Sequence, residues 1–333
     1  MKVKKDTQKN IYLGVQLLRI IFSFHILILH CINLEIYKSY IIKMIIKKVS
    51  IDLGTFFIIS FYFSYNNFTS SNIIKIKQRF IRLLIPYFIW PIIFFILNIF
   101  TGYIYKRNTI KFKYLYYQFL IGNGIHPIFW FQFNLLFLSL LFAIIILINR
   151  KRYLSNLFLM AIVCYLFINY SNYSLLFLKY NDIAFFSTRP IAFSFIYCFI
   201  GFYLFSINII EKTNKYKIKI IIICLFILFL CINSKLSFYL IIINSLTSTS
   251  LFILFLIIPF PTLNNTIFIK IIKQLANYSA GIYYLHNQIQ YLLDYFIKSR
   301  TIFACLINYL LCNLICFFGL KIFKKSNLRF LYI

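Results

Sequence analysis

The sequence predicts an all-α, polytopic membrane helix bundle of about ten transmembrane helices. Of its 333 residues, 62% are hydrophobic and only 12% are charged, whereas soluble domains contain about 25% charged residues. The mean hydropathy is +0.86. The apolar residues also gather in segments of roughly 17–25 residues, the length that a helix needs to cross the core of a bilayer.

The predicted spans follow one another along nearly the whole chain, so we expect one integral membrane domain over residues 1–333. The spans are placed at 13–34, 49–65, 83–103, 129–149, 154–170, 190–209, 218–233, 238–258, 275–293 and 302–322. The spans at 154–170 and 218–233 are short. A merged or re-entrant segment at either place would change the topology that follows.

The distribution of basic residues orients these spans. With a cytoplasmic N-terminus, 21 of the 35 Lys and Arg residues fall in cytoplasmic segments and 13 in outer ones, the bias expected of inner loops. Both termini are therefore predicted to be cytoplasmic, in a multi-pass protein of the cell (inner or plasma) membrane. The net charge of +29 is assigned to loops near lipid headgroups. No nucleic-acid partner is expected, because no soluble module carries the charge.

Three outer loops are long enough to contribute to function. Residues 35–48 alternate basic and apolar side chains, which is typical of a short interfacial helix. Residues 104–128 and 171–189 form the other two loops. They can shape the mouth of an acceptor site or serve as tethers.

No metal site is expected. The four histidines lie in three separate segments, and no acidic residue shares a helix with them at ligand spacing. The eight cysteines include no CxxC pair, so they are interpreted as small buried apolar residues.

The first span contains one arginine and two histidines. An ionisable side chain in hydrocarbon is costly and indicates a functional site. Arg19 and His30 are eleven residues apart, which places them on one helix face about 16 Å apart along the axis, whereas His25 lies about 140° from His30. A neutral imidazole such as that of His30 can remove a proton from a hydroxyl group. An interhelical hydrogen bond is the alternative role for His30, and His25 is assigned to packing.

A second constellation follows at the cytoplasmic start of the third span. Arg79 and Arg82 are i,i+3 neighbours, an arrangement that suits a phosphate-rich ligand. Topological anchoring by positive charge is the alternative. Pro86 is expected to break or kink this span.

Other polar residues lie within or beside the later spans. Ser60 can bond to its own helix backbone, and Trp130 fits an aromatic belt at the outer interface. Gln132 and Asn134 need hydrogen-bond partners if they are buried. His286 lies about two turns after Ser279 on nearly the same helix face, and an interhelical hydrogen bond is again the alternative role.

Taken together, these residues resemble the acyltransferase 3 family of integral membrane acyltransferases. Six weak motifs occur in the family's order from residue 19 to residue 286: Arg19 with His30; the run FFIISFYF; Arg79-x-x-Arg82 before Pro86, Tyr87 and Trp90; Trp130-Phe131; Arg189 before FIGFYL; and SAGIYYLH, from Ser279 to His286. The plainest departure is Phe61, where the family usually has glycine after the serine.

The resemblance implies transfer of an acyl group, usually acetyl, from cytoplasmic acyl-CoA to a hydroxyl of a cell-surface or lipid-linked glycan. His30 would act as general base or carry the acyl group briefly, with Arg19 orienting it or the donor. Arg79 and Arg82 would hold the CoA phosphates. Substrate-side roles are expected for Arg189, His286, Ser60 and Trp130.

Membrane lipids, acyl-CoA and the glycan acceptor are therefore the expected partners. Acyl-CoA is expected as a donor substrate, with no permanently bound cofactor. The alternative function is translocation of a polysaccharide or glycolipid without acyl transfer. Ten spans, the scarcity of acidic residues and the departure at Phe61 motivate it.

Overall fold

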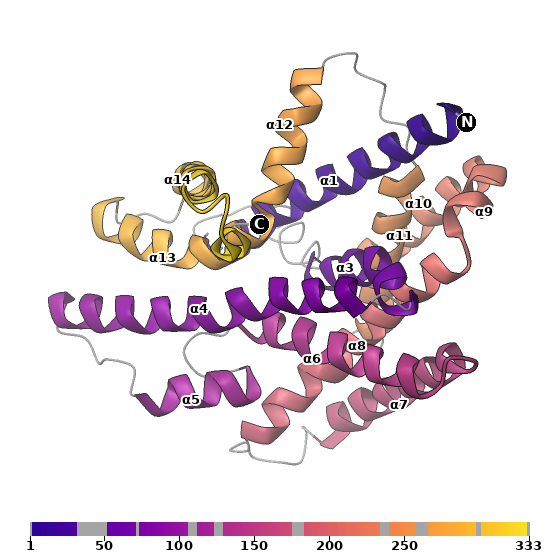
Figure 1. Ribbon diagram of the computed structural model, residues 1–333, viewed down its shortest axis with the longest axis horizontal. Helices are drawn as coiled ribbons and strands as arrows, with labels where there is room; N and C mark the ends of the chain where they lie inside the picture. Colours follow the sequence, from indigo (N-terminus) through magenta and orange to yellow (C-terminus); the bar gives the residue numbers. More distant parts are fainter. Residues whose placement is uncertain are drawn as a thin grey trace. The chain divides into compact units, whose positions relative to one another are not determined.

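In the computed structural model, every regular element of the described residues is helical (Figure 1). The structure describes residues 2–31, 52–70, 73–105, 112–122, 129–174, 183–233, 240–257, 266–297 and 301–331. The helices are α1 (Lys2–Cys31), α3 (Asp52–Thr69), α4 (Ile73–Tyr105), α5 (Phe112–Ile121), α6 (Phe129–Ile148), α7 (Tyr153–Ser174), α8 (Ile183–Ser206), α9 (Ile209–Lys215), α10 (Lys217–Asn233), α11 (Leu240–Ile257), α12 (Thr266–Asn277), α13 (Ser279–Ile297), α14 (Ile302–Ile322) and a 3₁₀ turn, η1 (Asn327–Leu331).

The all-α prediction is confirmed, and each predicted span overlaps a helix. Four helical segments are long and apolar enough to cross a membrane: Leu13–His30, Ile73–Leu97, Phe129–Ile148 and Ile302–Ile322. Shorter apolar stretches lie in α7, α8 and α11. The number of spans therefore stays a prediction. The predicted interfacial helix at 35–48 lies outside the described residues, and the predicted loop at 104–128 contains α5.

The predicted ninth span, 275–293, is not one continuous helix. It is interrupted at Tyr278, whose N–H is shared between the carbonyls of Gln274 and Leu275 at 3.3 and 3.1 Å. α12 ends before this turn and α13 begins after it, and the two helices run in different directions (Figure 1). Apolar content alone could not reveal the break, because apolar residues continue on both sides of it.

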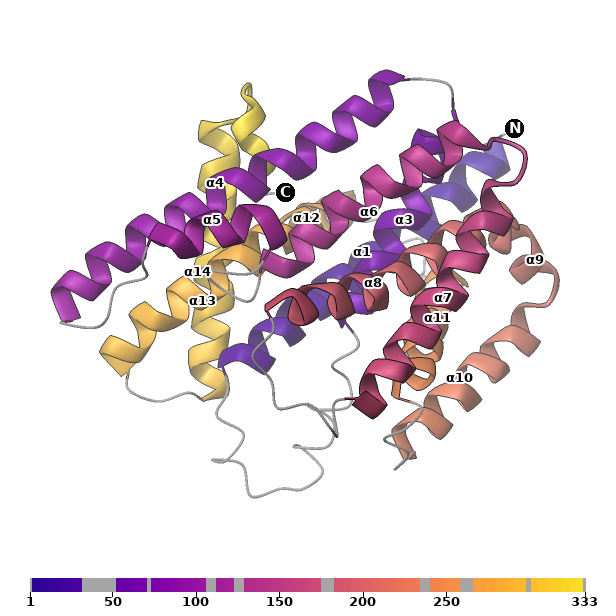
Figure 2. The same cartoon turned by 90° about the horizontal axis from the view of Figure 1, so that it is seen from below.

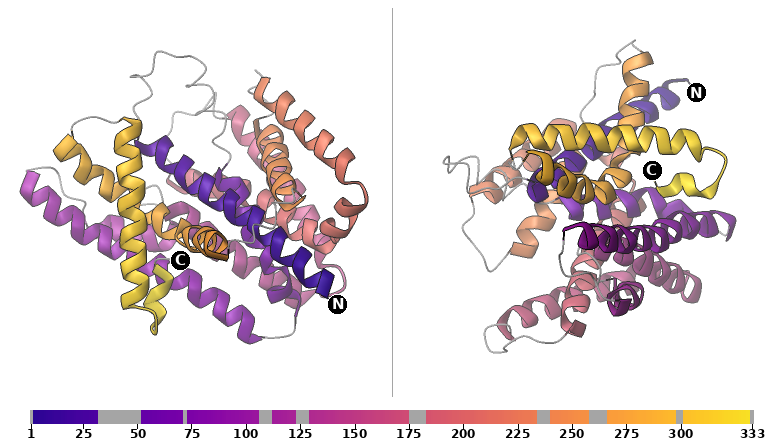
Figure 3. Two further views of the ribbon diagram at one scale, coloured as in Figure 1. Left: turned by 90° about the horizontal axis from the view of Figure 1, so that it is seen from above. Right: turned by 90° about the vertical axis from the view of Figure 1, so that its left-hand side faces the viewer.

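The chain divides into two compact units, Met1–Ile59 with Asn208–Ile333 (unit 1) and Ser60–Ile207 (unit 2). In unit 1, α1 packs against α11, α12, α13 and α14. α14 also packs against α13 (Figure 3). Completely buried apolar residues such as Leu27 and Ile282 fill the core of this unit.

In unit 2, α6 packs against α4, α7 and α8, and α7 packs along α8 (Figure 2). The amides of α6 find the partners that burial requires. Gln132 Nε2 donates to the carbonyl of Leu83 at 2.9 Å, and Asn134 Nδ2 donates to Ser194 Oγ at 3.0 Å. α4 continues through both Pro86 and Pro91, so the predicted break at Pro86 does not end this helix.

α5 ends at Gly122, which adopts a φ of +71° and donates its N–H to the carbonyl of Gln118 at 3.0 Å. This left-handed conformation favours glycine. A Cβ atom at this position would also collide with the Phe133 side chain. Glycine therefore allows α5 to end against α6.

Replacing Asn308 with alanine is expected to destabilise unit 1. Asn308 on α14 is completely buried and donates to the His286 carbonyl at 2.8 Å and to Gln290 Oε1 at 3.2 Å. Loss of these interhelical bonds should cost about 1–2 kcal/mol, seen as a lower apparent Tm of the protein in detergent. Asn313→Ala is the control, because the Asn313 amide donates to the Tyr309 carbonyl of its own helix, with no bond to another helix among the described residues. Equal losses in the two variants would contradict this role for Asn308.

Candidate functional site

Two contacts between ionisable or polar side chains link α1 to α13 in unit 1. The first involves Arg19, which is half-buried. Its Nη2 donates to Ser279 Oγ at 2.9 Å, and its Nη1 donates to Gln16 Oε1 at 3.3 Å. The intramembrane arginine of the first span is thus bonded to the serine at the start of the late motif.

The second contact is a pair of histidines. The ring centroids of His30 and His286 are 5.3 Å apart, with the ring planes inclined at 40°. His30 is exposed at the C-terminal end of α1, and His286 is completely buried. His286 Nδ1 lies 3.1 Å from the carbonyl oxygen of Ile282. Because a carbonyl only accepts hydrogen bonds, Nδ1 carries the proton in this contact.

The two contacts occur in the same order along both helices, so α1 and α13 run in the same direction. Helical spacing had placed Arg19 with His30 on one face, and Ser279 with His286 on another. The structure brings these two faces together, which no periodicity argument could establish. His25, predicted to lie away from this face, is half-buried on α1.

A buried polar network continues from His286 towards the end of α13. Gln290 Oε1 accepts from Asn308, and Gln290 Nε2 donates to Asp294 Oδ1 at 2.7 Å. Cys312 Sγ donates to Asn308 Oδ1 at 3.2 Å. Neither Asn308 nor Gln290 was predicted from the sequence as a site residue. Both are amides inside apolar segments, like Gln132 and Asn134, and this pattern could have indicated that they are buried and hydrogen-bonded.

In unit 2, the Arg79 guanidinium is buried among hydroxyl groups and aromatic rings. Its Nε donates to Ser139 Oγ and its Nη2 to Ser60 Oγ, each at 3.1 Å, and Nη1 bonds to Ser64 Oγ. Only 8% of Arg79 is exposed. Within the described residues, no carboxylate accepts a hydrogen bond from it. Ser60, which was expected to bond to its own helix backbone or to a substrate, accepts a hydrogen bond from Arg79.

Phe61 forms one aromatic wall of this arginine site. The Arg79 guanidinium carbon lies 5.1 Å from the Phe61 ring centroid and 5.3 Å from that of Phe68. Phe61 is completely buried and contacts Phe142 edge-to-face at 4.7 Å. Each cation–π contact contributes about 0.5–2 kcal/mol. Phe61 therefore belongs to the packed core of unit 2, where it faces a cation.

Arg82 differs from Arg79 in its surroundings. It is exposed, and its Nε bonds to the Gln78 carbonyl of its own helix at 3.3 Å. Its terminal nitrogens make no hydrogen bond with another described residue. The guanidinium is therefore available to an anionic ligand.

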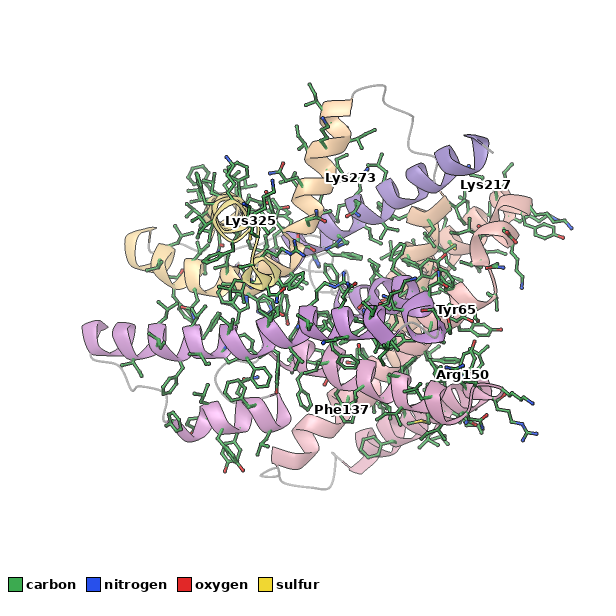
Figure 4. The ribbon with its side chains drawn as sticks, in the orientation of Figure 1. Tyr65, Phe137, Arg150, Lys217, Lys273 and Lys325 are labelled. Carbon is green, nitrogen blue, oxygen red and sulfur yellow. The ribbon has the colours of Figure 1, made fainter. Side chains whose placement is uncertain are left out.

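Predicted cytoplasmic ends of several helices meet in unit 2. The Tyr65 hydroxyl at the end of α3 lies 2.8 Å from that of Tyr153 at the start of α7. The Tyr65 ring also stacks on Phe205 near the end of α8, at 4.9 Å. Arg150 lies in the adjoining turn (Figure 4). The three ends thus lie together, and the charge pattern predicts the cytoplasmic side for all of them.

The model of an acyltransferase domain, that of the acyltransferase 3 family, matches residues 12–330. The chain belongs to the acyltransferase 3 family. This match supports a membrane acyltransferase and includes nearly all of both units. Searches of curated proteins and of solved structures returned no match.

The remaining residues predicted from the family motifs are less informative. Trp130 is half-buried at the start of α6, with its ring centroid 6.3 Å from that of Phe131. Arg189 lies within α8, but its side chain is outside the described set. Among the described residues, no group of three or more His, Cys, Asp or Glu side chains could hold a metal ion.

Replacing Arg79 with lysine is expected to destabilise the protein. Lysine keeps the charge but lacks the planar fork that bonds to three serines at once. The loss should be of order 2 kcal/mol, measured as a lower apparent Tm in detergent. Arg82→Lys is the matched control, because Arg82 is exposed on the same helix. Equal effects of the two changes would show that the serine site contributes no particular stability.

Proposed function

We propose that this acyltransferase moves an acyl group, with acetyl as the expected group, from cytoplasmic acyl-CoA to a hydroxyl of a cell-surface or lipid-linked glycan. The observation that carries the proposal is the pairing of Arg19 and His30 on α1 with Ser279 and His286 on α13. This pairing brings the ionisable and hydroxyl groups of two family motifs together within unit 1. The proposed setting is the cell membrane, where a cytoplasmic donor and an external acceptor can both be reached.

His30 is the proposed general base. It is the exposed member of the histidine pair, so its imidazole can reach a bound hydroxyl. The acceptor oxygen forms a bond to the thioester carbon while its proton passes to His30. The carbon–sulfur bond then breaks, and His30 returns the proton to the CoA thiolate. The products are the acyl ester and free CoA.

Arg19 is proposed to orient the reactants. Its Nη2 is fixed by Ser279, and this fixed cation lies about three helical turns from His30 on the same face of α1. An arginine held in this way can meet an anionic part of the donor without losing its own position.

The two arginines of α4 are given different roles. Arg82 is exposed and suits the phosphates of CoA, since a guanidinium binds phosphate oxygens in a fork. Arg79 donates to three serines. We assign it to holding the cytoplasmic part of unit 2, with a direct role in donor binding secondary to that of Arg82.

His30→Ala is expected to abolish acyl transfer while the protein still accumulates in the membrane. Loss of a general base lowers the rate by about 10²–10⁴-fold. The assay uses radiolabelled acetyl-CoA and membrane vesicles that contain the cell's own lipid-linked glycans. His25→Ala is the control, because His25 lies on another face of α1. Near-normal transfer by His30→Ala would contradict the mechanism.

Arg82→Ala is expected to raise the KM for acetyl-CoA about tenfold, the effect of one charge-assisted hydrogen bond, with little change in kcat. Lys219→Ala provides the comparison, since Lys219 is also exposed at a predicted cytoplasmic helix end but lies in unit 1. Initial rates over a range of acetyl-CoA concentrations separate the two constants. An unchanged KM would contradict phosphate binding by Arg82 and would favour its alternative role as a topological anchor.

A further inference from the structure

The buried histidine of the pair, for which the family resemblance implied a substrate-side role, takes no part in the proton transfer described above. His286 is completely buried, so an acceptor molecule cannot reach it as readily as it reaches His30. Its ring nevertheless lies next to the proposed base, with 5.3 Å between the centroids. The inference that follows rests on the proposed function and concerns how His286 acts on His30.

The tautomer of His286 is determined by its own helix. The Ile282 carbonyl lies 3.1 Å from Nδ1 and accepts the Nδ1 proton. In the neutral imidazole, Nε2 then carries a lone pair and can only accept. A hydrogen-bond acceptor is thus held beside the His30 ring.

The backbone around His286 is also held in place. The His286 carbonyl accepts a hydrogen bond from Asn308 of α14 at 2.8 Å. About two turns earlier on the same face of α13, Ser279 is bonded to Arg19. His286 is therefore fixed by neighbours on both sides, whereas His30 is exposed at the end of α1 and its ring can turn.

We propose that His286 is a positioning residue for His30. During the reaction the exposed His30 ring turns, and one of its N–H groups donates to His286 Nε2. The lone pair of the opposite His30 nitrogen is then directed at the acceptor hydroxyl. The hydrogen-bond order is His30 to His286 to the Ile282 carbonyl. When His30 takes the hydroxyl proton, both of its nitrogens carry hydrogen, and the bond to His286 stabilises the cation. No proton leaves His30 until it returns to the CoA thiolate.

Two substitutions of His286 test this role. His286→Leu removes the acceptor and is expected to lower kcat by about 10–100-fold, as loss of an orienting partner typically does. The KM values for both substrates should stay nearly constant. His286→Gln supplies an amide oxygen and should recover kcat about fivefold over the leucine variant, the contribution of one neutral hydrogen bond. A raised KM for the acceptor with unchanged kcat would overturn the proposal, since it would indicate substrate binding.

A double variant tests whether His286 acts through His30. Adding His286→Leu to His30→Ala should cost no further activity, because the orienting partner has nothing left to orient. Tyr284→Phe is the structural control: Tyr284 is equally buried on the opposite face of α13 and should leave kcat unchanged. A further loss in the double variant would overturn the proposal.

A chemical readout separates failure of this inference from failure of the proposed function. Diethyl pyrocarbonate modifies neutral imidazole nitrogen, and mass spectrometry of the α1 peptide follows the reaction at His30 without any acyl transfer. A hydrogen bond from one ring nitrogen makes the other more basic. The rate at His30 should therefore fall severalfold in His286→Leu and less in His286→Gln. Equal or faster modification in His286→Leu would refute the positioning role, whatever reaction the protein catalyses.

Discussion

The contact between α1 and α13 is the interaction on which the proposed site depends. Hydrocarbon supplies no partner for a guanidinium or an imidazole, so these groups must be satisfied by other helices. Arg19 is bonded to Ser279, and His30 lies against His286. Because the two contacts lie along parallel segments, they fix both the register and the facing sides of the helices. Asn308 then ties α14 to the same stretch of α13.

In unit 2, a buried arginine also needs partners from other helices, but its partners are of a different kind. This arginine is surrounded by three serine hydroxyls and two aromatic rings, with no carboxylate among its described neighbours. This solution suits a sequence with only six acidic residues. It also gives a physical reason for phenylalanine at position 61, where the family resemblance led us to expect glycine: the ring fills space and faces the cation. Phe61 is thus part of the packing around Arg79.

The sequence was sufficient to predict an all-α membrane protein, because length and apolar content follow directly from the bilayer. Spacing was also sufficient to group Arg19 with His30 and Ser279 with His286. It could not predict which faces meet, since that depends on packing between distant segments. Apolar content likewise missed the turn at Tyr278. The sequence could not predict that Arg79 is buried and Arg82 is exposed for a related reason. Two neighbouring residues of one helix can contact different residues of other helices.

Mass spectrometry of surface and lipid-linked glycans tests the central claim most directly. Three strains are compared: one without the gene, one with the wild-type gene and one with the His30→Ala allele. The account predicts glycans that carry an added acyl mass only with the wild-type gene, at similar glycan abundance in all three strains. Identical acylation in all three strains would contradict it. Loss of surface glycan without any change in acylation would instead indicate a translocator.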